Sequence, residues 1–167
     1  MRIRSATAED LPAVLALNEE SVHVLAPLSR ERLESLDARA SYHRVALDRD
    51  EVIGFLLAFG SDADHDSVNF CWFAARYASF LYVDRVVVRA ARWGSGVGSL
   101  LYDDLFAFAR AGGYERITCE IDAEPANPRS ARFHDRFGFR EVGHQQVEYV
   151  AGAAKRVSLR CAELARE

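Results

Sequence analysis

Three alternating glycines in the middle of the chain form the segment whose spacing most clearly suggests chemistry. Gly94, Gly96 and Gly98 follow an apolar run that reads as a strand, and a helical pattern begins among them. The first N–H groups of a helix are unpaired and carry partial positive charge, and glycine lets an anion approach them closely. The segment therefore predicts a phosphate or pyrophosphate site.

Two familiar nucleotide-binding classes do not fit this loop. A dinucleotide-binding loop reads G-x-G-x-x-G near the start of a βαβ unit, whereas Ser99 holds the last glycine position here and the loop lies mid-chain. A P-loop needs a lysine after its last glycine, and Lys155, the only lysine of the chain, lies far away. Backbone amides, with Arg92 as a candidate cation, are left to hold the anion.

A second motif, N-P-R-S-A-R-F-H-D-R-F-G-F, occupies residues 127–139, one predicted strand after the glycine loop. With the W-G-S-G-V-G of residues 93–98, it resembles two signatures of the Gcn5-related N-acetyltransferase (GNAT) superfamily. These are [QR]-x-x-G-x-[GA], which cradles the pyrophosphate of acetyl-CoA, and N-x-x-[SA]-x-x-[FL]-[YH]-x-x-x-G-F. Trp93 departs from the usual Gln or Arg. The resemblance extends to a bacterial subgroup and covers residues 20–78 only in outline.

The resemblance implies an α+β fold in one domain over residues 1–167, with a mixed, mostly antiparallel central sheet, a splayed strand pair and about four flanking helices. It implies acetyl-CoA as co-substrate and transfer of the acetyl group by direct attack of an amine, on a small molecule or a peptide. The residues it assigns to acetyl-CoA are Val86, Val87, Val88, Trp93, Gly94, Ser95, Gly96, Val97, Gly98, Ser99, Asn127, Ser130 and Phe133. The alternatives are a GNAT-fold module that binds acyl-CoA without turnover, and use of a longer acyl chain.

Such a transfer needs a base for the ammonium and an acid for the departing thiolate. Glu120 is the first candidate base, because it precedes Asn127 much as a glutamate does in the ribosomal-protein-acetylating branch of the family. Asp84 is the rival, because it lies in the other strand of the expected pair. His134 stands where the family usually has tyrosine and is the candidate acid, although helix histidines often only pack.

Hydrophobic periodicity predicts the elements that position these residues. The order is β-α-α-β-β-β-α-β-α-β-β, with a hairpin turn at Arg49-Asp50. Residues 60–78 read as irregular, with an acidic tip and then an aromatic run that is either a substrate lid or an apolar cluster. Acidic residues at this tip and at Asp84 would favour a cationic amine as acceptor (Asp62, Asp64 and Asp66 at the tip).

Composition narrows the class further. Twenty-one cationic residues against 25 acidic ones give a net charge of −4, which argues against nucleic acid as the main partner. Cys71, Cys119 and Cys161 are scattered, and the histidines show no metal spacing, so we expect neither a disulfide framework nor a metal. No signal-like or membrane-length apolar stretch occurs, which predicts a cytoplasmic protein that needs no membrane. GNAT proteins are often dimers, so a homodimer is one expectation.

Overall fold

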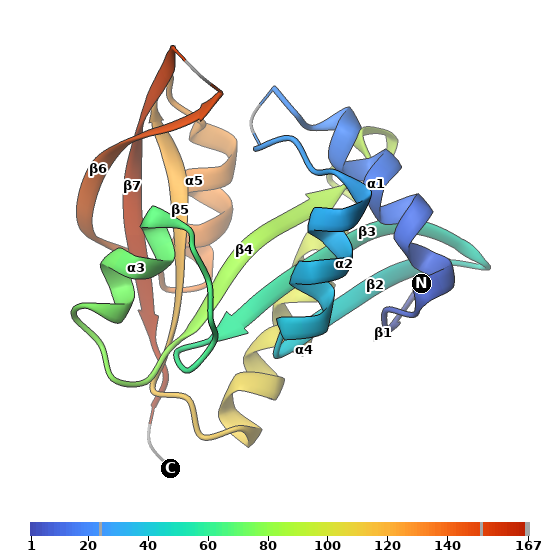
Figure 1. Ribbon diagram of the computed structural model, residues 1–167. Helices are drawn as coiled ribbons and strands as arrows, with labels where there is room; N and C mark the ends of the chain where they lie inside the picture. The colour runs from blue at the N-terminus through green and yellow to red at the C-terminus, as the bar shows by residue number, and fades with distance from the viewer. Residues whose placement is uncertain (24, 151, 166–167) are drawn as a thin grey trace. The chain divides into compact units, whose positions relative to one another are not determined.

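The computed structural model describes residues 1–23, 25–150 and 152–165 (Figure 1). Its seven strands follow the order β1-β2-β3-β4-β5-β7-β6. Registers are defined for four antiparallel pairings, β1–β2, β2–β3, β5–β7 and β6–β7, and for the parallel pairing of β4 with β5. Register shifts interrupt β2–β3, β5–β7 and β6–β7. The strands are β1 (Arg2–Ser5), β2 (Tyr42–Asp48), β3 (Glu51–Gly60), β4 (Leu81–Val88), β5 (Arg116–Glu124), β6 (Arg140–Val150) and β7 (Ala153–Glu163). The predicted α+β class with a mixed, mostly antiparallel sheet is confirmed.

The contacts of the chain fall into two compact units. The first consists of Met1–Phe59 and Val83–Phe108, and the second of Gly60–Tyr82 and Ala109–Glu167. Strand β4 and helix α4 (Val97–Ala111) each cross a boundary, so both run through the two units. The expectation of a single domain over residues 1–167 stays a prediction.

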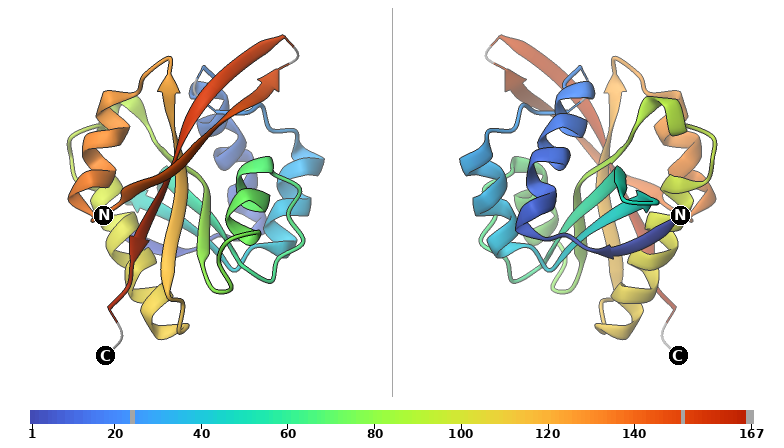
Figure 2. Two further views of the ribbon diagram at one scale, coloured as in Figure 1. Left: turned by 90° about the vertical axis from the view of Figure 1, so that its left-hand side faces the viewer. Right: turned by 90° about the vertical axis from the view of Figure 1, so that its right-hand side faces the viewer.

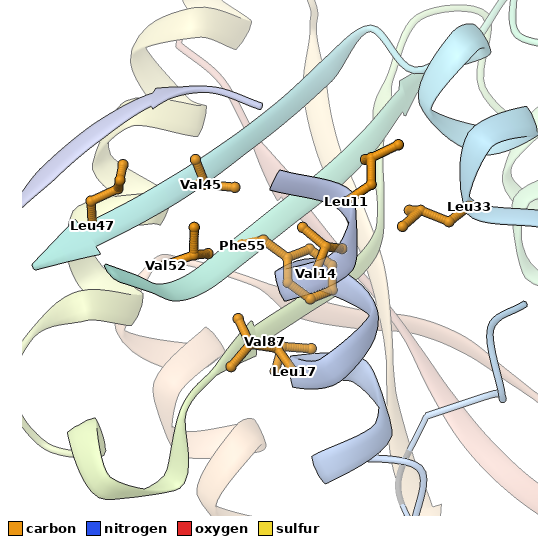
Figure 3. Close-up of a cluster of buried hydrophobic side chains, with 9 residues drawn as sticks. All are labelled: Leu11, Val14, Leu17, Leu33, Val45, Leu47, Val52, Phe55 and Val87. Carbon is orange, nitrogen blue, oxygen red and sulfur yellow. The ribbon is translucent and has the colours of Figure 1, made fainter. Parts of the chain in front are cut away.

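In the first unit, α1 (Leu11–Glu20) and α2 (Arg30–Arg39) contribute apolar side chains to a core built on one face of β2 and β3. Figure 3 shows this core, in which α1 lies over the strands and the last part of β4 adds a valine. Burial of such side chains is the main favourable term in folding. The core consists of Leu11, Val14, Leu17, Leu33, Val45, Leu47, Val52, Phe55 and Val87.

The opposite face of the same strands carries α4. The ring of Tyr42 meets that of Phe108 edge to face at 5.2 Å, and the Tyr42 hydroxyl donates to Asp104 at 2.7 Å. Near the start of the helix, a Cβ built on Gly54 would lie 2.9 Å from the carbonyl oxygen of Val87 and 3.3 Å from Val97 Cγ1. A side chain at Gly54 would therefore push β4 and the first turn of α4 away from β3.

In the second unit, β5, β7 and β6 form an antiparallel sheet, with β6 and β7 as a long hairpin (Figure 2). Helix α3 (Val68–Ala74) and helix α5 (Pro128–Arg136) lie on opposite faces of this sheet in both figures. The parallel ladder between β4 and β5 consists of Leu81↔Ile117 and Tyr82↔Thr118, although both strands continue beyond it. Such a short ladder is what the predicted splayed pair requires.

The prediction of an irregular segment over residues 60–78 is wrong at its centre, where α3 forms. The Ser67 hydroxyl accepts hydrogen bonds from the amides of Asn69 and Phe70, which caps the helix, and Phe70 and Phe73 are buried. Five α-helices are thus described instead of about four. The aromatic run packs as an apolar cluster, since these phenylalanines lie beneath the surface where a lid would expose them.

Candidate active site

The glycine loop connects β4 to α4 in the first unit. A short 3-10 helix (Ala90–Arg92) follows β4, and α4 begins at Val97, where the Leu100 amide donates to the Gly96 carbonyl at 2.9 Å. Gly94 and Gly96 have φ angles of +80° and +88°, a region that other residues rarely adopt. A Cβ on either would meet nothing within 4 Å, so the backbone faces open space. The loop has the form that close approach of an anion requires.

The arginines around this loop are engaged with carboxylates. Arg92 Nη2 lies 2.6 Å from Asp48 Oδ2, and Arg89 pairs with Glu51. Arg92, the candidate cation of the sequence, is thus already neutralised by its own partner. The backbone amides at the start of α4 add the partial positive charge of a helix N-terminus beside these ion pairs.

Trp93 holds the loop to the end of β4. Its side chain is 51% exposed, and its indole Nε1 donates to the Val88 carbonyl oxygen at 2.8 Å. Within β4, Val87 points into the core with α1, while Val86 and Val88 are half-buried. Ser95 adds a hydrogen bond from its hydroxyl to the Arg92 carbonyl at 2.6 Å, and Val97 is buried. The side chains of Trp93, Ser95 and Val97 therefore hold the loop in place, and Gly94 and Gly96 remain exposed.

Asp84, the rival base, forms an ion pair within its own strand. Arg85 Nε lies 2.7 Å from Asp84 Oδ2, and the Asp84 side chain is 7% exposed. The same guanidinium donates to Asn18 Oδ1 at 3.0 Å and to the Ala26 carbonyl at 3.4 Å. Because Arg85 stabilises the ionised carboxylate and ties β4 to α1, the geometry favours a structural role for Asp84.

Glu120, the first candidate base, is half-buried on β5 in the second unit. The hydroxyl of Tyr82 lies 3.0 Å from Glu120 Oε1 and 2.9 Å from Oε2, so it donates to the carboxylate from the neighbouring strand. Sequence reasoning missed Tyr82 as a site residue. The register of the parallel ladder places Tyr82 beside Thr118, and no local signal in the sequence predicts that register.

His134, the candidate acid, is a buried packing residue of α5. It is 4% exposed, and its Nδ1 lies 2.7 Å from the Ser130 carbonyl oxygen. A carbonyl only accepts, so Nδ1 carries the proton. Burial, reinforced by nearby Arg160, lowers the pKa of His134 to about 4, although the bond to Ser130 opposes the shift. At neutral pH the imidazole is therefore uncharged, which disfavours proton donation to a thiolate.

The other α5 residues of the second motif have visible structural roles. Asn127 Oδ1 accepts from the Ser130 amide at 3.1 Å and caps the helix, and the half-buried Phe133 meets the Phe137 ring at 5.2 Å. These contacts fix where α5 begins and how it packs. They leave the predicted contacts with acetyl-CoA as predictions.

Two expectations about metals and thiols can be compared with the described residues. Over residues 1–23, 25–150 and 152–165, no group of three His, Cys, Asp or Glu side chains could hold a metal ion. Cys119 is buried, and burial raises the pKa of its thiol well above the usual value, which disfavours a nucleophilic role.

Among the described residues, every helix is too short or too polar to cross a membrane.

The model of the acetyltransferase (GNAT) family matches residues 11–139. This chain belongs to that family. Its likeness to a curated member is local: 58 residues are 48% identical to the phosphinothricin N-acetyltransferase of Streptomyces coelicolor. The match includes 35% of this chain and spans about a third (33%) of the relative's length.

Solved structures of the family share the fold over the full chain. The ribosomal-protein-alanine N-acetyltransferase of Brucella melitensis is 25% identical, with a TM-score of 0.76 over 98% of this chain and 100% of its own. The yncA protein of Salmonella typhimurium, solved with its cofactor acetyl-CoA, is 22% identical, with a TM-score of 0.76 over 100% of this chain and 95% of its own. The glycine loop, between β4 and α4, lies within the segment that the family model matches.

Proposed function

We propose that the protein is an acetyl-CoA-dependent N-acetyltransferase that transfers an acetyl group directly to an amine. The observation that carries this proposal is the exposed loop at the start of α4, in which Gly94 and Gly96 have positive φ and open Cβ positions. The loop lies within the segment that matches the acetyltransferase family. A loop of this form, in this family, is the expected binding site of a pyrophosphate.

The residues of the first unit fit acetyl-CoA at its polar end. The backbone of Gly94, Ser95, Gly96, Val97, Gly98 and Ser99 would hold the pyrophosphate through its amides, of which that of Ser95 also donates to the Arg92 carbonyl at 3.3 Å. The backbone of Val86, Val87 and Val88 would bind the pantetheine arm. The resemblance also assigns Asn127, Ser130 and Phe133, which belong to the second unit, to acetyl-CoA. When bound, acetyl-CoA supplies the acetyl thioester. We infer acetyl as the acyl group from the family, and a panel of longer thioesters tests this.

Glu120 is the proposed general base. Its carboxylate is half-buried and held by the Tyr82 hydroxyl, so it can receive a proton from the ammonium of the acceptor, which frees the amine to attack. Asp84 remains the second choice, because Arg85 already occupies its carboxylate. No enzyme nucleophile is needed, because the amine nitrogen forms the new bond to the acetyl carbonyl carbon while the C–S bond breaks. The CoA sulfur leaves as a thiolate and receives the second proton of the nitrogen directly or through solvent. We propose His134 as a packing residue and not as the acid, because its imidazole is uncharged at neutral pH and its one N–H donates to the Ser130 carbonyl.

The acceptor is proposed to be an amine on a small molecule or a peptide terminus. The relatives named above acetylate phosphinothricin and the alanine of a ribosomal protein, so both kinds belong in the assay. The acidic residues Asp62, Asp64 and Asp66 support a cationic acceptor through long-range attraction. A cytoplasmic homodimer without nucleic-acid or membrane partners remains our expectation for the protein in the cell.

Acetyl-CoA binding measured by calorimetry tests the loop assignment. Gly96→Asp should reduce affinity at least about tenfold, because it adds bulk and negative charge where a pyrophosphate must approach. Gly113→Asp is the matched control: Gly113 also has positive φ (+73°) and an open Cβ, but it follows the C-terminal end of α4. Equal affinity of the Gly96 and Gly113 variants would refute the assignment.

Turnover separates an enzyme from a binding module without activity. Thiol release from acetyl-CoA should rise with an amine from the panel, and mass spectrometry should show an acceptor heavier by one acetyl group. The assay requires a Cys71→Ser background, because Cys71 is an exposed free thiol that would react with the thiol reagent. Tight acetyl-CoA binding without an acetylated product from any amine would favour the module.

A further inference from the structure

The ring of Tyr82 is enclosed by three other rings in the second unit. Phe70 and His65 meet it edge to face at centroid distances of 5.7 and 5.8 Å, and Phe73 lies at 6.0 Å. Tyr82 itself is 1% exposed. The surrounding rings leave the tyrosine little freedom to rotate, so its hydroxyl has a fixed direction.

That direction leads to Glu120. The phenol oxygen of Tyr82 lies 3.0 and 2.9 Å from the two carboxylate oxygens of Glu120, and its single proton is donated to this carboxylate. The Ser67 hydroxyl lies 3.5 Å from the phenol oxygen, and Ser67 donates in this contact because the tyrosine proton is directed at the carboxylate. Ser67, Tyr82 and Glu120 thus form a chain of polar groups that ends on the proposed base.

We propose that Tyr82 is a positioning residue that fixes the carboxylate of Glu120 and stabilises its ionised form. This inference rests on the proposed function, since it assigns Tyr82 to the base named there. A hydrogen bond to a charged group is stronger than one between neutral groups, and it favours the ionised form of a carboxyl. Tyr82 would therefore keep Glu120 deprotonated, and oriented, at lower pH than an unassisted glutamate.

Other titratable groups belong to β5, β7 and the segment that packs on Tyr82, and they must stay constant in the test. Two residues along β5, Asp122 pairs with Lys155 of β7 at 3.1 Å. His65 packs edge to face on Tyr82, and its Nδ1 accepts from the Ser67 amide at 3.0 Å. The thiol of Cys119 is acted on electrostatically by both Glu120 and Arg160, and His65 Nδ1 lies 3.7 Å from Asp66 Oδ1. A change confined to the Tyr82 hydroxyl leaves all of these in place.

The decisive variant is Tyr82→Phe, which removes the hydroxyl and keeps the ring. The acidic limb of the pH profile of kcat/KM should move up by about one pH unit, which is the size expected for loss of a hydrogen bond to a charged group. The kcat should fall about tenfold, less than the fall of about a hundredfold or more in Glu120→Gln, with the KM for acetyl-CoA unchanged. Glutamate labelled with 13C reports the same shift directly, because the titration midpoint of the Glu120 carboxylate should rise in the free protein.

Tyr42→Phe is the matched control. Tyr42 is another buried tyrosine whose hydroxyl donates to a carboxylate, that of Asp104 at 2.7 Å, within the first unit. Its variant should lose stability and leave the acidic limb and the Glu120 midpoint unchanged. Where Tyr82→Phe does not fold, uniform incorporation of 3-fluorotyrosine makes each phenol a stronger donor, so the midpoint should move down. An unmoved midpoint there would overturn the proposal.

The possible failures point to different causes. If Glu120→Gln keeps the kcat and the acidic limb of the unmodified protein, Glu120 is not the base and Tyr82 has no catalytic role through it. If Glu120→Gln loses activity while Tyr82→Phe changes neither the limb nor the carbon-13 midpoint, the proposed base stands and the role of Tyr82 is refuted. An equal shift of the limb in Tyr42→Phe also refutes it, because loss of stability alone would then explain the effect.

Discussion

The contact between α3 and β6 offers a sharp test of how the second unit is packed. A Cβ built on Gly143 would lie 2.4, 2.9 and 3.3 Å from Cζ2, Cη2 and Cε2 of Trp72, three atoms of the larger indole ring. Ordinary contact begins at about 3.4 Å, so the methyl group of Gly143→Ala would have to gain about 1 Å. Overpacking of this kind costs about 1–3 kcal/mol.

Arg76 limits how the indole can respond, because its guanidinium lies over the Trp72 ring, 3.7 Å from the centroid. Beside this contact, Gln145 donates to Asn69 at 2.6 Å, which fixes α3 on β6 at a second point. We therefore expect Gly143→Ala to lower the free energy of unfolding by about 2 kcal/mol, and the melting temperature by about 4–8 °C for a chain of this length. Urea denaturation and thermal melting measure the two quantities.

A double-mutant cycle identifies the cause of the loss. Trp72→Phe removes the outer ring atoms that approach Gly143, so Gly143→Ala should cost at least about 1 kcal/mol less in that background. Gly143 has no positive φ, so backbone strain does not enter. Wild-type stability of Gly143→Ala, or the same loss in both backgrounds, would refute the packing argument.

Two further predictions concern pH. The Arg4 guanidinium, with a smaller contribution from Thr7, lowers the pKa of Asp10 to about 2. Folded Asp10 therefore binds fewer protons than unfolded Asp10 in moderate acid, and its ionised carboxylate stabilises the fold. This contribution to the free energy of unfolding is complete above about pH 5 and is lost toward pH 2. It amounts to about 2 kcal/mol, and Asp10→Asn should remove this slope from urea titrations; an unchanged slope would contradict it. Burial lowers the pKa of His134 to about 4, so the folded protein is stabilised by the neutral imidazole. The contribution of His134 to the free energy of unfolding is complete above the unfolded pKa of about 6.5 and falls by about 2 kcal/mol between pH 6.5 and 5. His134→Asn should be insensitive to that interval, and equal pH dependence of the two proteins would show that His134 is not the cause.

Local signals predicted most of the elements because those elements depend on local physics. Ser29 and Asn127 cap α2 and α5 with side-chain oxygens, as their positions before helical patterns indicate. Arg49 adopts a positive φ at the predicted turn between β2 and β3. The glycine loop also depends on local backbone geometry, since Gly94 and Gly96 have positive φ.

The relations between distant residues could not be obtained in this way. Glu120 was a candidate because of its residue type and motif, but its partner Tyr82 depends on the register between β4 and β5. The motif suggested His134 as an acid, and only the burial of α5 against β-structure shows that its imidazole is neutral. The sequence likewise made Asp84 a candidate base, but the ion pair with Arg85 depends on the folded structure. Burial and charge pairing are products of the tertiary fold, and a single sequence does not display them.

The aromatic run after residue 69 shows why a choice between lid and core was too narrow. Phe70 and Phe73 are buried, so they form a core, yet the residue that they and His65 enclose is Tyr82. Because the side-chain hydroxyl of that tyrosine donates to Glu120, our proposal for Tyr82 implies that the packing of the cluster also restricts this carboxylate. A packed core thereby acts on the candidate site without contact with a substrate, and substitutions that shrink Phe70 or Phe73 should loosen the carboxylate as well as the fold.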